Sequence, residues 1–217
     1  MSSIVVRNLS DQLVELVRDR ILSGAVQPDL PIKQDALAAE LGVSKIPLRE
    51  ALARLEQEGL LRSQANRGFF VRALSTEEAE EVYALRLKLE PEAVALAAER
   101  ADETDRRQAR EALEVLDRAT DAHGEGVGAL NRAFHLALIR PSGQQITAAF
   151  LERLHVMAER YVRKHLEPHG RDVRAKDEHQ ELLNAWFDRD GKAVAALMRD
   201  HIGQTLDDLR RQLAAEK

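Results

Sequence analysis

The chain has 217 residues, of which 44% are hydrophobic and 32% charged, and it contains no cysteine. This length is enough to bury a core. No apolar run approaches the roughly 18 residues of a membrane span, and the first residues lack a signal-peptide pattern. We therefore expect a cytoplasmic protein with no membrane partner. Without cysteine, disulfides and thiolate metal sites are excluded, so a metal ion must be held by nitrogen and oxygen atoms.

The formal net charge of −5 is unevenly divided along the chain. Residues 1–72 carry +1, whereas residues 73–217 carry −6. An acidic chain is a poor match for nucleic acid, because phosphate binding depends on clustered cations. The division confines the acidity to the second part and leaves the first part open to DNA.

Residues 1–72 predict three helices followed by a hairpin. Apolar residues recur at helical spacing from Asp11 to Leu22, QDALAAEL predicts a short second helix, and Ser44 is a suitable N-cap for a third helix that ends at Gly59. Beyond it, LLRS and GFFVR flank QANR, with Gly68 available for a positive φ, which is typical of a β-hairpin. This order of elements indicates a winged helix-turn-helix.

Helical patterns predominate in the rest of the chain. The first of these helices begins at Ser75 or Thr76, either of which can cap it, and Pro91 marks a kink or a restart. Helices are expected at 77–101, 104–121, 128–139, 144–166, 172–188 and 190–213.

Together these elements predict a mainly α protein with two domains. The N-terminal winged helix-turn-helix covers residues 1–72, and residues 73–76 form a linker. Residues 77–217 form an all-α helical bundle.

The third helix has the features of a DNA-reading helix. Lys45 and Arg49 are four residues apart, so they share one face, roughly opposite the leucine stripe. Arginine can pair bidentately with guanine, and Lys45 or the Ser44 hydroxyl can reach bases or phosphates. Arg62, Arg67 and Arg72 add cations to the hairpin. The alternative is an ordinary solvated charged face.

The segment LAAELGVSKIPLREALARLEQEGLLRSQANRGFFV resembles the winged helix-turn-helix of the GntR family of bacterial transcription regulators. Three residues depart from the usual family pattern: Lys45 stands where arginine is commoner, Ile46 where threonine is usual, and Asp29 where glycine is usual. Because lysine lacks the bidentate guanidinium fork of arginine, we expect the operator preference to differ from that of the family. The resemblance implies a homodimer on double-stranded DNA with a pseudo-palindromic operator. It also implies that the DNA contacts come from Ser44, Lys45, Arg49, Arg67 and Gly68.

Three histidines lie on three different predicted helices: His135, His179 and His201. A single histidine inside a core is most often a hydrogen-bonded structural residue. Three on separate helices of one bundle favour a metal site, because facing helices build such sites in bundle cores. Imidazole suits Zn, Ni, Fe, Mn or Co, and Asn131, one turn before His135, can add an oxygen ligand.

The segments EEVYALRLKLEPEAVALAA, LNRAFHLALI and EHQELLNAWFDRDGKAVAALMRDHI resemble the FCD domain, the helical effector-binding and dimerisation domain of the FadR-type branch of the same family. In many members an Asp-x-x-x-His pair and two later histidines hold a divalent metal ion, and a small carboxylate effector completes its coordination. His135, His179 and His201 match those positions, and Asn131 replaces the aspartate. A neutral amide binds a divalent cation more weakly than a carboxylate does. It also leaves the full double charge of the ion to attract an anionic ligand. A metal-free ligand site is the alternative.

Arg86 matches an arginine that is typical of this domain and often faces the cavity, so we expect it to bind the effector carboxylate. The alternative is an ion pair with Glu90, one turn further on. Nothing local separates other candidate lining residues from ordinary packing and surface residues, namely Tyr83, Arg160, Tyr161 and Arg163. We interpret the remaining histidines as surface or turn residues: His123, His155, His165 and His169.

Three functions are consistent with these features. The first is a DNA-binding transcription regulator, expected to be a repressor that leaves its operator when a small organic acid binds. The second is a metal-dependent hydrolase or lyase of the helical-bundle type, for which the H-E-x-x-H and G-x-S-x-G motifs are missing. The third is a helical adaptor with structural histidines. We expect a regulator rather than an enzyme.

Overall fold

The computed structural model describes residues 9–22, 25–26, 28, 30–122, 126–166 and 170–215, without the side chains of residues 163 and 164. Two compact units divide the chain, residues 1–73 and 74–217. Asp29, His123 and His169, singled out above, lie outside the described residues. Within the described part, no helix is long and apolar enough to cross a membrane.

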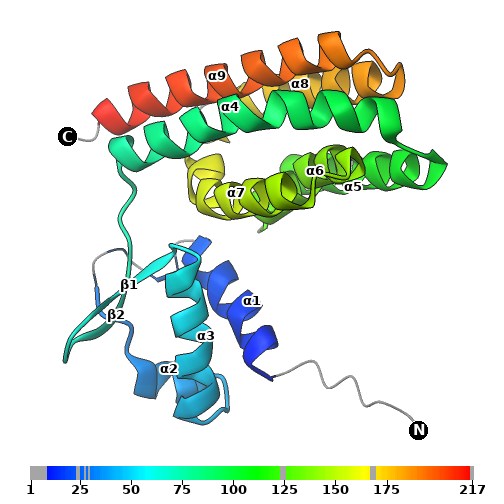
Figure 1. Cartoon of the computed structure of the whole chain (residues 1–217). Helices are drawn as coiled ribbons and strands as arrows, with labels where there is room; N and C mark the ends of the chain where they lie inside the picture. Colours follow the sequence, from blue (N-terminus) through cyan, green and yellow to red (C-terminus); the bar gives the residue numbers. More distant parts are fainter. Residues whose placement is uncertain are drawn as a thin grey trace, which may run out of the picture. The chain divides into compact units, whose positions relative to one another are not determined.

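The first unit contains the three helices and the hairpin that the sequence predicts (Figure 1). The strands pair antiparallel, with Leu61 opposite Val71 and Gln64 opposite Gly68. Gly68 has φ +86°, the positive value that the turn requires and that glycine adopts without strain. The elements are α1 (Leu9–Leu22), α2 (Gln34–Glu40), α3 (Lys45–Gln57), β1 (Leu61–Gln64) and β2 (Gly68–Val71).

The core of this unit is built by the apolar stripe of α3. Leu48, Leu52 and Leu55 are completely buried, and α1 packs against them with Val17. Because these leucines recur at helical spacing, burying them turns the opposite face of α3 outward. That outward face carries the polar residues at the start of the helix.

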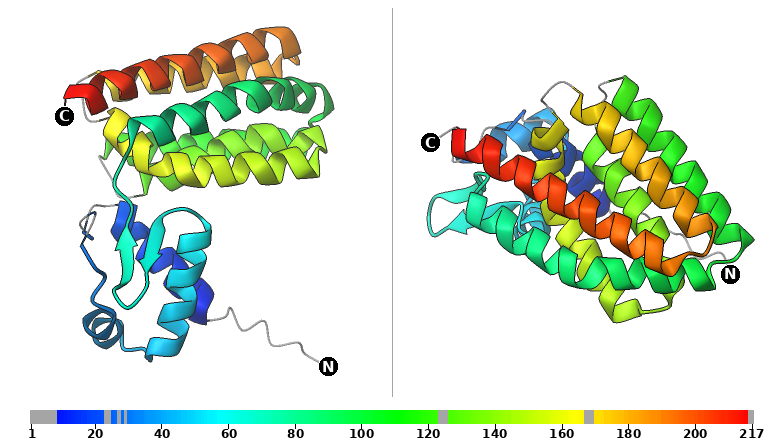
Figure 2. Two further views of the ribbon diagram at one scale, coloured as in Figure 1. Left: turned by 60° about the vertical axis from the view of Figure 1, so that its left-hand side comes forward. Right: turned by 90° about the horizontal axis from the view of Figure 1, so that it is seen from above.

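The second unit is an all-α bundle, so the predicted fold class is confirmed. Its two longest helices, α4 and α9, run antiparallel and side by side (Figures 1 and 2). The 3-10 turn η1 leads from α6 into α7. The elements are α4 (Thr76–Arg100), α5 (Glu103–Asp121), α6 (Val127–Ile139), η1 (Arg140–Ser142), α7 (Gln145–Leu166), α8 (Arg171–Phe187) and α9 (Gly191–Ala215).

Local signals at α4 show how its first turn is held. The Ser75 hydroxyl accepts a hydrogen bond from the Glu78 amide at 3.0 Å, so Ser75 rather than Thr76 is the N-cap. The helix continues through the buried Pro91, so the alternative of a restart there is wrong. One uninterrupted helix therefore carries Arg86 and Glu90 into the bundle.

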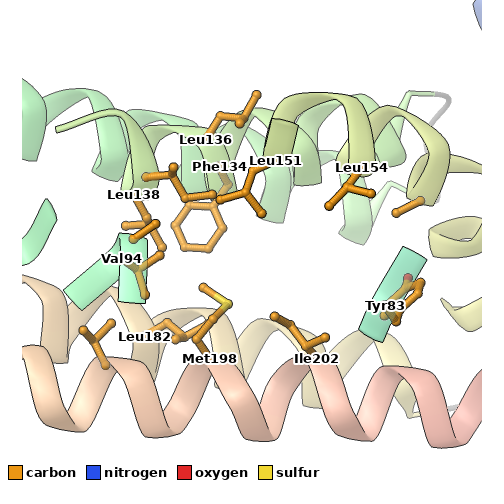
Figure 3. Packing of buried hydrophobic residues seen from close by; sticks show 14 of the residues in the cluster. Tyr83, Val94, Phe134, Leu136, Leu138, Leu151, Leu154, Leu182, Met198 and Ile202 are labelled. Carbon is orange, nitrogen blue, oxygen red and sulfur yellow. The ribbon is translucent and has the colours of Figure 1, made fainter. Parts of the chain in front are cut away.

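The bundle core brings apolar side chains from different helices together (Figure 3). Phe134 of α6, Leu182 of α8 and Met198 of α9 are completely buried. Phe134 also contacts the His179 ring edge-on, with the ring centroids 5.1 Å apart. Packed apolar residues thus hold the histidine-bearing helices in fixed positions.

Candidate DNA-reading surface and metal centre

The start of α3 presents the polar side chains that reading DNA requires. Ser44, Lys45 and Arg49 are exposed, and the Ser44 hydroxyl makes no capping hydrogen bond to the helix. Lys45 contacts Asp35 at 2.6 Å, but both side chains are mostly exposed, and such surface ion pairs contribute little free energy. No ion pair is recorded for Arg49 within the described part of the chain. All three side chains are available to a ligand.

The hairpin places two guanidinium groups around one aromatic ring. The Arg62 and Arg67 guanidinium carbons lie 5.0 and 5.6 Å from the centroid of the Phe70 ring. Such cation–π contacts restrict long side chains without neutralising their charge. At the turn, a Cβ on Gly68 would lie 3.2 Å from Gln34 Nε2, so a larger residue would crowd α2. The hairpin thus has the cations and the tight turn of a DNA-binding wing.

In the second unit, three helices bring the three predicted histidines together. His135 of α6, His179 of α8 and His201 of α9 are buried, and one nitrogen of each lies within 4.8 Å of the others. The ring centroids are 4.9 to 5.5 Å apart. Asn131, one turn before His135 on α6, lines the same pocket as His179 and His201.

Carboxylates orient two of these rings from behind. The Nδ1 atom of His135 lies 2.8 Å from Glu90 Oε1, and that of His201 lies 2.7 Å from Glu178 Oε2. A carboxylate accepts the hydrogen bond, so the proton resides on Nδ1 and the Nε2 lone pair is free. Carboxylates bound in this way to metal-ligating histidines are the usual outer partners of such sites.

The site contains donor atoms that protein groups leave unsatisfied. Within the described residues, Nε2 of His135 and Nε2 of His179 are buried and have no hydrogen-bond partner. An unsatisfied buried polar atom costs about 1–3 kcal/mol. Three converging imidazoles, two of them with an unpartnered Nε2, and an amide oxygen are a donor set that suits a divalent transition metal ion. The residues therefore fit such an ion.

Electrostatics keep these imidazoles in the form that a metal ion needs. Burial and the neighbouring imidazoles hold the pKa of His179 and of His201 well below its ordinary value. Burial also lowers the pKa of His135, although Glu90 opposes this shift. A lowered pKa keeps a histidine neutral at pH 7, and only neutral imidazole has a lone pair for a metal ion.

The structure shows Arg86 in the ion pair that the sequence left as its alternative. Arg86 Nε donates to Glu90 Oε2 at 2.9 Å, and both side chains are buried. Burial alone would raise the pKa of Glu90, but Arg86 and the histidine hydrogen bonds hold it well below its ordinary value. Arg86 also lines the pocket, so its charge is close to any ligand there, although Glu90 compensates it.

Two histidines that we interpreted as surface residues are buried, so that interpretation is wrong. His155 is 2% exposed, and its Nε2 donates to Glu90 Oε1 at 3.1 Å. Burial and the Arg86 charge lower the pKa of His155 to about 3. His165 is 5% exposed and lines the pocket, and burial lowers its pKa to about 4. Both sit on the inner face of α7, which single-residue reasoning could not distinguish from the outer face.

The other candidate lining residues divide between the pocket and the start of α4. Tyr83 lines the pocket and is buried beside Arg86, whose guanidinium carbon lies 5.1 Å from the centroid of the tyrosine ring. Tyr161 Oη instead donates to the Ser75 carbonyl at 3.1 Å. Arg160 pairs with Glu78 at 3.5 Å. The Arg163 side chain lies outside the described residues.

The pocket beside the histidines receives residues from every helix between α4 and α9. The cavity has a volume of about 30 Å³, which is room for about two or three water molecules. The space suits an ion with a small ligand.

Sequence reasoning missed Glu178 and Asp117, although Glu178 directly precedes His179 and Asp117 lies among apolar residues of α5.

A winged helix-turn-helix followed in the chain by a helical bundle defines a class of two-domain DNA-binding regulators. Residues 9–71 match "Bacterial regulatory proteins, gntR family", and residues 81–204 match the FCD domain. The chain therefore belongs to the GntR family of transcriptional regulators, in the branch with an FCD domain, as its sequence predicts. It is a regulator and not an enzyme, like its named relatives.

Individual relatives span nearly the whole chain. The Nta operon transcriptional regulator of Aminobacter aminovorans is 31% identical, over 84% of this chain and 86% of that protein. The HTH-type transcriptional repressor GlaR of Escherichia coli is 26% identical, over 91% and 94%. The solved structure of E. coli McbR/YncC superimposes with a TM-score of 0.77 and 26% identity, covering 98% of this chain and 99% of that one.

Proposed function

We propose that this regulator is a cytoplasmic homodimeric repressor whose helical domain holds a divalent metal ion and a small carboxylate effector. Two observations carry this proposal. One nitrogen of each of His135, His179 and His201 lies within 4.8 Å of the others, and the buried Nε2 atoms of His135 and His179 have no hydrogen-bond partner within the described residues. Asn131 would complete the protein ligands. A bound divalent ion would supply positive charge that attracts a carboxylate.

The protein side of the mechanism follows from the residues around the site. Glu90 and Glu178 fix the tautomers of His135 and His201, so the Nε2 lone pair of each ring is left for a metal ion. Arg86 adds a buried positive charge at the pocket wall. Zinc or nickel suits this nitrogen-rich donor set.

On the DNA side, we propose that Ser44, Lys45 and Arg49 read the major groove and that Arg67 and Gly68 place the wing on the backbone or minor groove. Two such domains in a homodimer would read a pseudo-palindromic operator. An effector can regulate the protein only if it binds one dimer geometry more tightly than the other. Release from DNA is the proposed outcome, in line with the repressor GlaR among the relatives.

Metal removal tests this function directly. Full-length protein is stripped with a chelator or reloaded with Zn²⁺ or Ni²⁺, and its affinity for DNA enriched from a random library is measured with and without small carboxylic acids. We expect at least one acid to weaken DNA binding of the loaded protein by about 5-fold or more, a typical allosteric coupling, and to leave the stripped protein unaffected. Equal responses of both forms would refute the role of the metal ion.

Changing Asn131→Asp is expected to tighten metal retention and to weaken the effector. A carboxylate attracts a dication more strongly than an amide does, but it removes one unit of the positive charge that the effector carboxylate feels. Competition with a chromogenic chelator measures the first effect, and calorimetric titration of the loaded protein measures the second. Asn184→Asp, on the exposed face of α8, is the control with the same chemical change. Unchanged chelator competition in Asn131→Asp would remove Asn131 from the ligand set.

A further inference from the structure

The pocket has a second polar region beside the histidines, on α5 and α8. Asp117 of α5 and Asp172 and Lys176 of α8 line it. Lys176 Nζ contacts both carboxylate oxygens of Asp121, at 2.7 and 2.9 Å. The charge of Lys176 is therefore already paired with a residue that does not line the pocket.

Asp117 lacks such a partner. Its Oδ1 atom is buried and makes no hydrogen bond within the described part of the chain. Lys176 interacts electrostatically with Asp121, Asp117 and Asp172 together, so one ammonium faces three carboxylates. Partial burial raises the pKa of Asp117, and Lys176 compensates this shift only in part while Asp121 adds to it. This region thus has an excess of negative charge and an acceptor atom that remains free.

The histidine end of the pocket has the opposite character. Its imidazoles and Asn131 are neutral, so a divalent ion there would keep its full double charge. Tyr83 adds a buried hydroxyl to this end. The two ends are close, because Lys176 and His179 are three residues apart on α8, which is about 4.5 Å along the helix axis. One small molecule can therefore contact both ends.

We propose that the effector is a short amino acid, whose carboxylate binds at the histidine end and whose ammonium group is bound by Asp117. This inference rests on the proposed function and identifies the chemical class of its ligand. A plain carboxylic acid would leave the Asp117 oxygen buried and unsatisfied, whereas an ammonium group supplies both the donor and the missing charge. The narrow space limits the chain between the two groups to about one or two carbon atoms.

Matched ligand pairs test the proposal on the zinc-loaded full-length protein. Calorimetric titration compares glycine with acetate and β-alanine with propionate. We expect at least one amino acid to bind about 10-fold or more tightly than its partner, because a hydrogen bond to a charged group is worth at least that factor. Asp117→Asn should abolish the difference and leave the affinity for the plain acid unchanged.

A control on the same helix separates a local contact from a general charge effect. Glu114→Gln removes one negative charge from an exposed position of α5, and it should preserve the preference for the amino acid. Two results would overturn the Asp117 assignment and leave the proposed function standing. One is equal affinity for the two members of every pair, and the other is an equal loss of affinity for both members in Asp117→Asn. Binding of no member of any pair would overturn both. A preference that persists in the stripped protein would keep Asp117 and refute the metal ion.

Discussion

Replacing Arg49 with alanine is expected to lower the affinity for operator DNA by about 10- to 100-fold, because one bidentate arginine–guanine contact contributes about 1–3 kcal/mol. The fold should persist: the Arg49 side chain is exposed, no ion pair is recorded for it within the described residues, and the leucines of α3 face the other way. Gel-shift titration with DNA enriched by the wild-type protein measures the loss, and thermal unfolding confirms that the domain is intact.

The conservative variant Arg49→Lys shows which kind of contact Arg49 makes. Lysine keeps the charge but loses the planar fork. A base contact predicts that the lysine variant loses specificity almost as fully as the alanine variant. A phosphate contact predicts that the lysine variant retains its affinity. It also predicts that Arg49→Ala weakens binding to all DNA sequences alike and lowers the slope of log affinity against log salt concentration by about one. Wild-type affinity in both variants would refute the assignment of α3 as the reading helix.

Replacing His179 with alanine is expected to lower metal affinity by more than about 100-fold. Removing only an outer hydrogen-bond partner of a ligand costs about 10- to 100-fold, and His179 is proposed as a direct ligand. The three rings form a triangle, with the His179 centroid 5.5 and 4.9 Å from those of His135 and His201, so the substitution removes one of three converging side chains. Elemental analysis and chelator competition measure the loss, and binding to DNA without effector should survive.

His165→Gln is the matched control for this experiment. His165 also lies on a helix of the bundle, is buried and lines the same pocket, but it is not part of the cluster of converging nitrogens. Its replacement should leave the metal content unchanged. A parallel loss of metal in both variants would indicate that loosening the bundle, rather than removing a ligand, is responsible. Retention of metal in His179→Ala would remove this residue from the site.

Local patterns predicted most of the fold. The apolar spacing of α3, the N-cap at Ser75 and the glycine of the hairpin are short-range signals, and the structure places each element within a few residues of its predicted range. At Pro91 the sequence left two alternatives, a kink or a restart, and the structure contradicts only the restart. Packing on both sides holds α4 together there, and the sequence around a proline does not report tertiary packing.

The candidate site was predictable where a motif carried it. The resemblance to the FCD domain selected His135, His179 and His201, and the structure brings them together. It did not reveal that His155 is buried against Glu90, because the two are 65 positions apart. Asp117 was missed for the same reason, since its importance comes from the pocket it lines.

By itself the sequence determined the order of helices and strands, because these depend on residues near one another along the chain. Its motifs also identified the family and, through the resemblance, the three histidines. Only the tertiary structure decided which ring nitrogens of His135 and His201 contact carboxylates and whether Arg86 is already paired. His135 is oriented by Glu90, 45 positions earlier, and His201 by Glu178, 23 positions earlier on another helix. Protonation and hydrogen bonding respond to neighbours in space, and folding sets those neighbours.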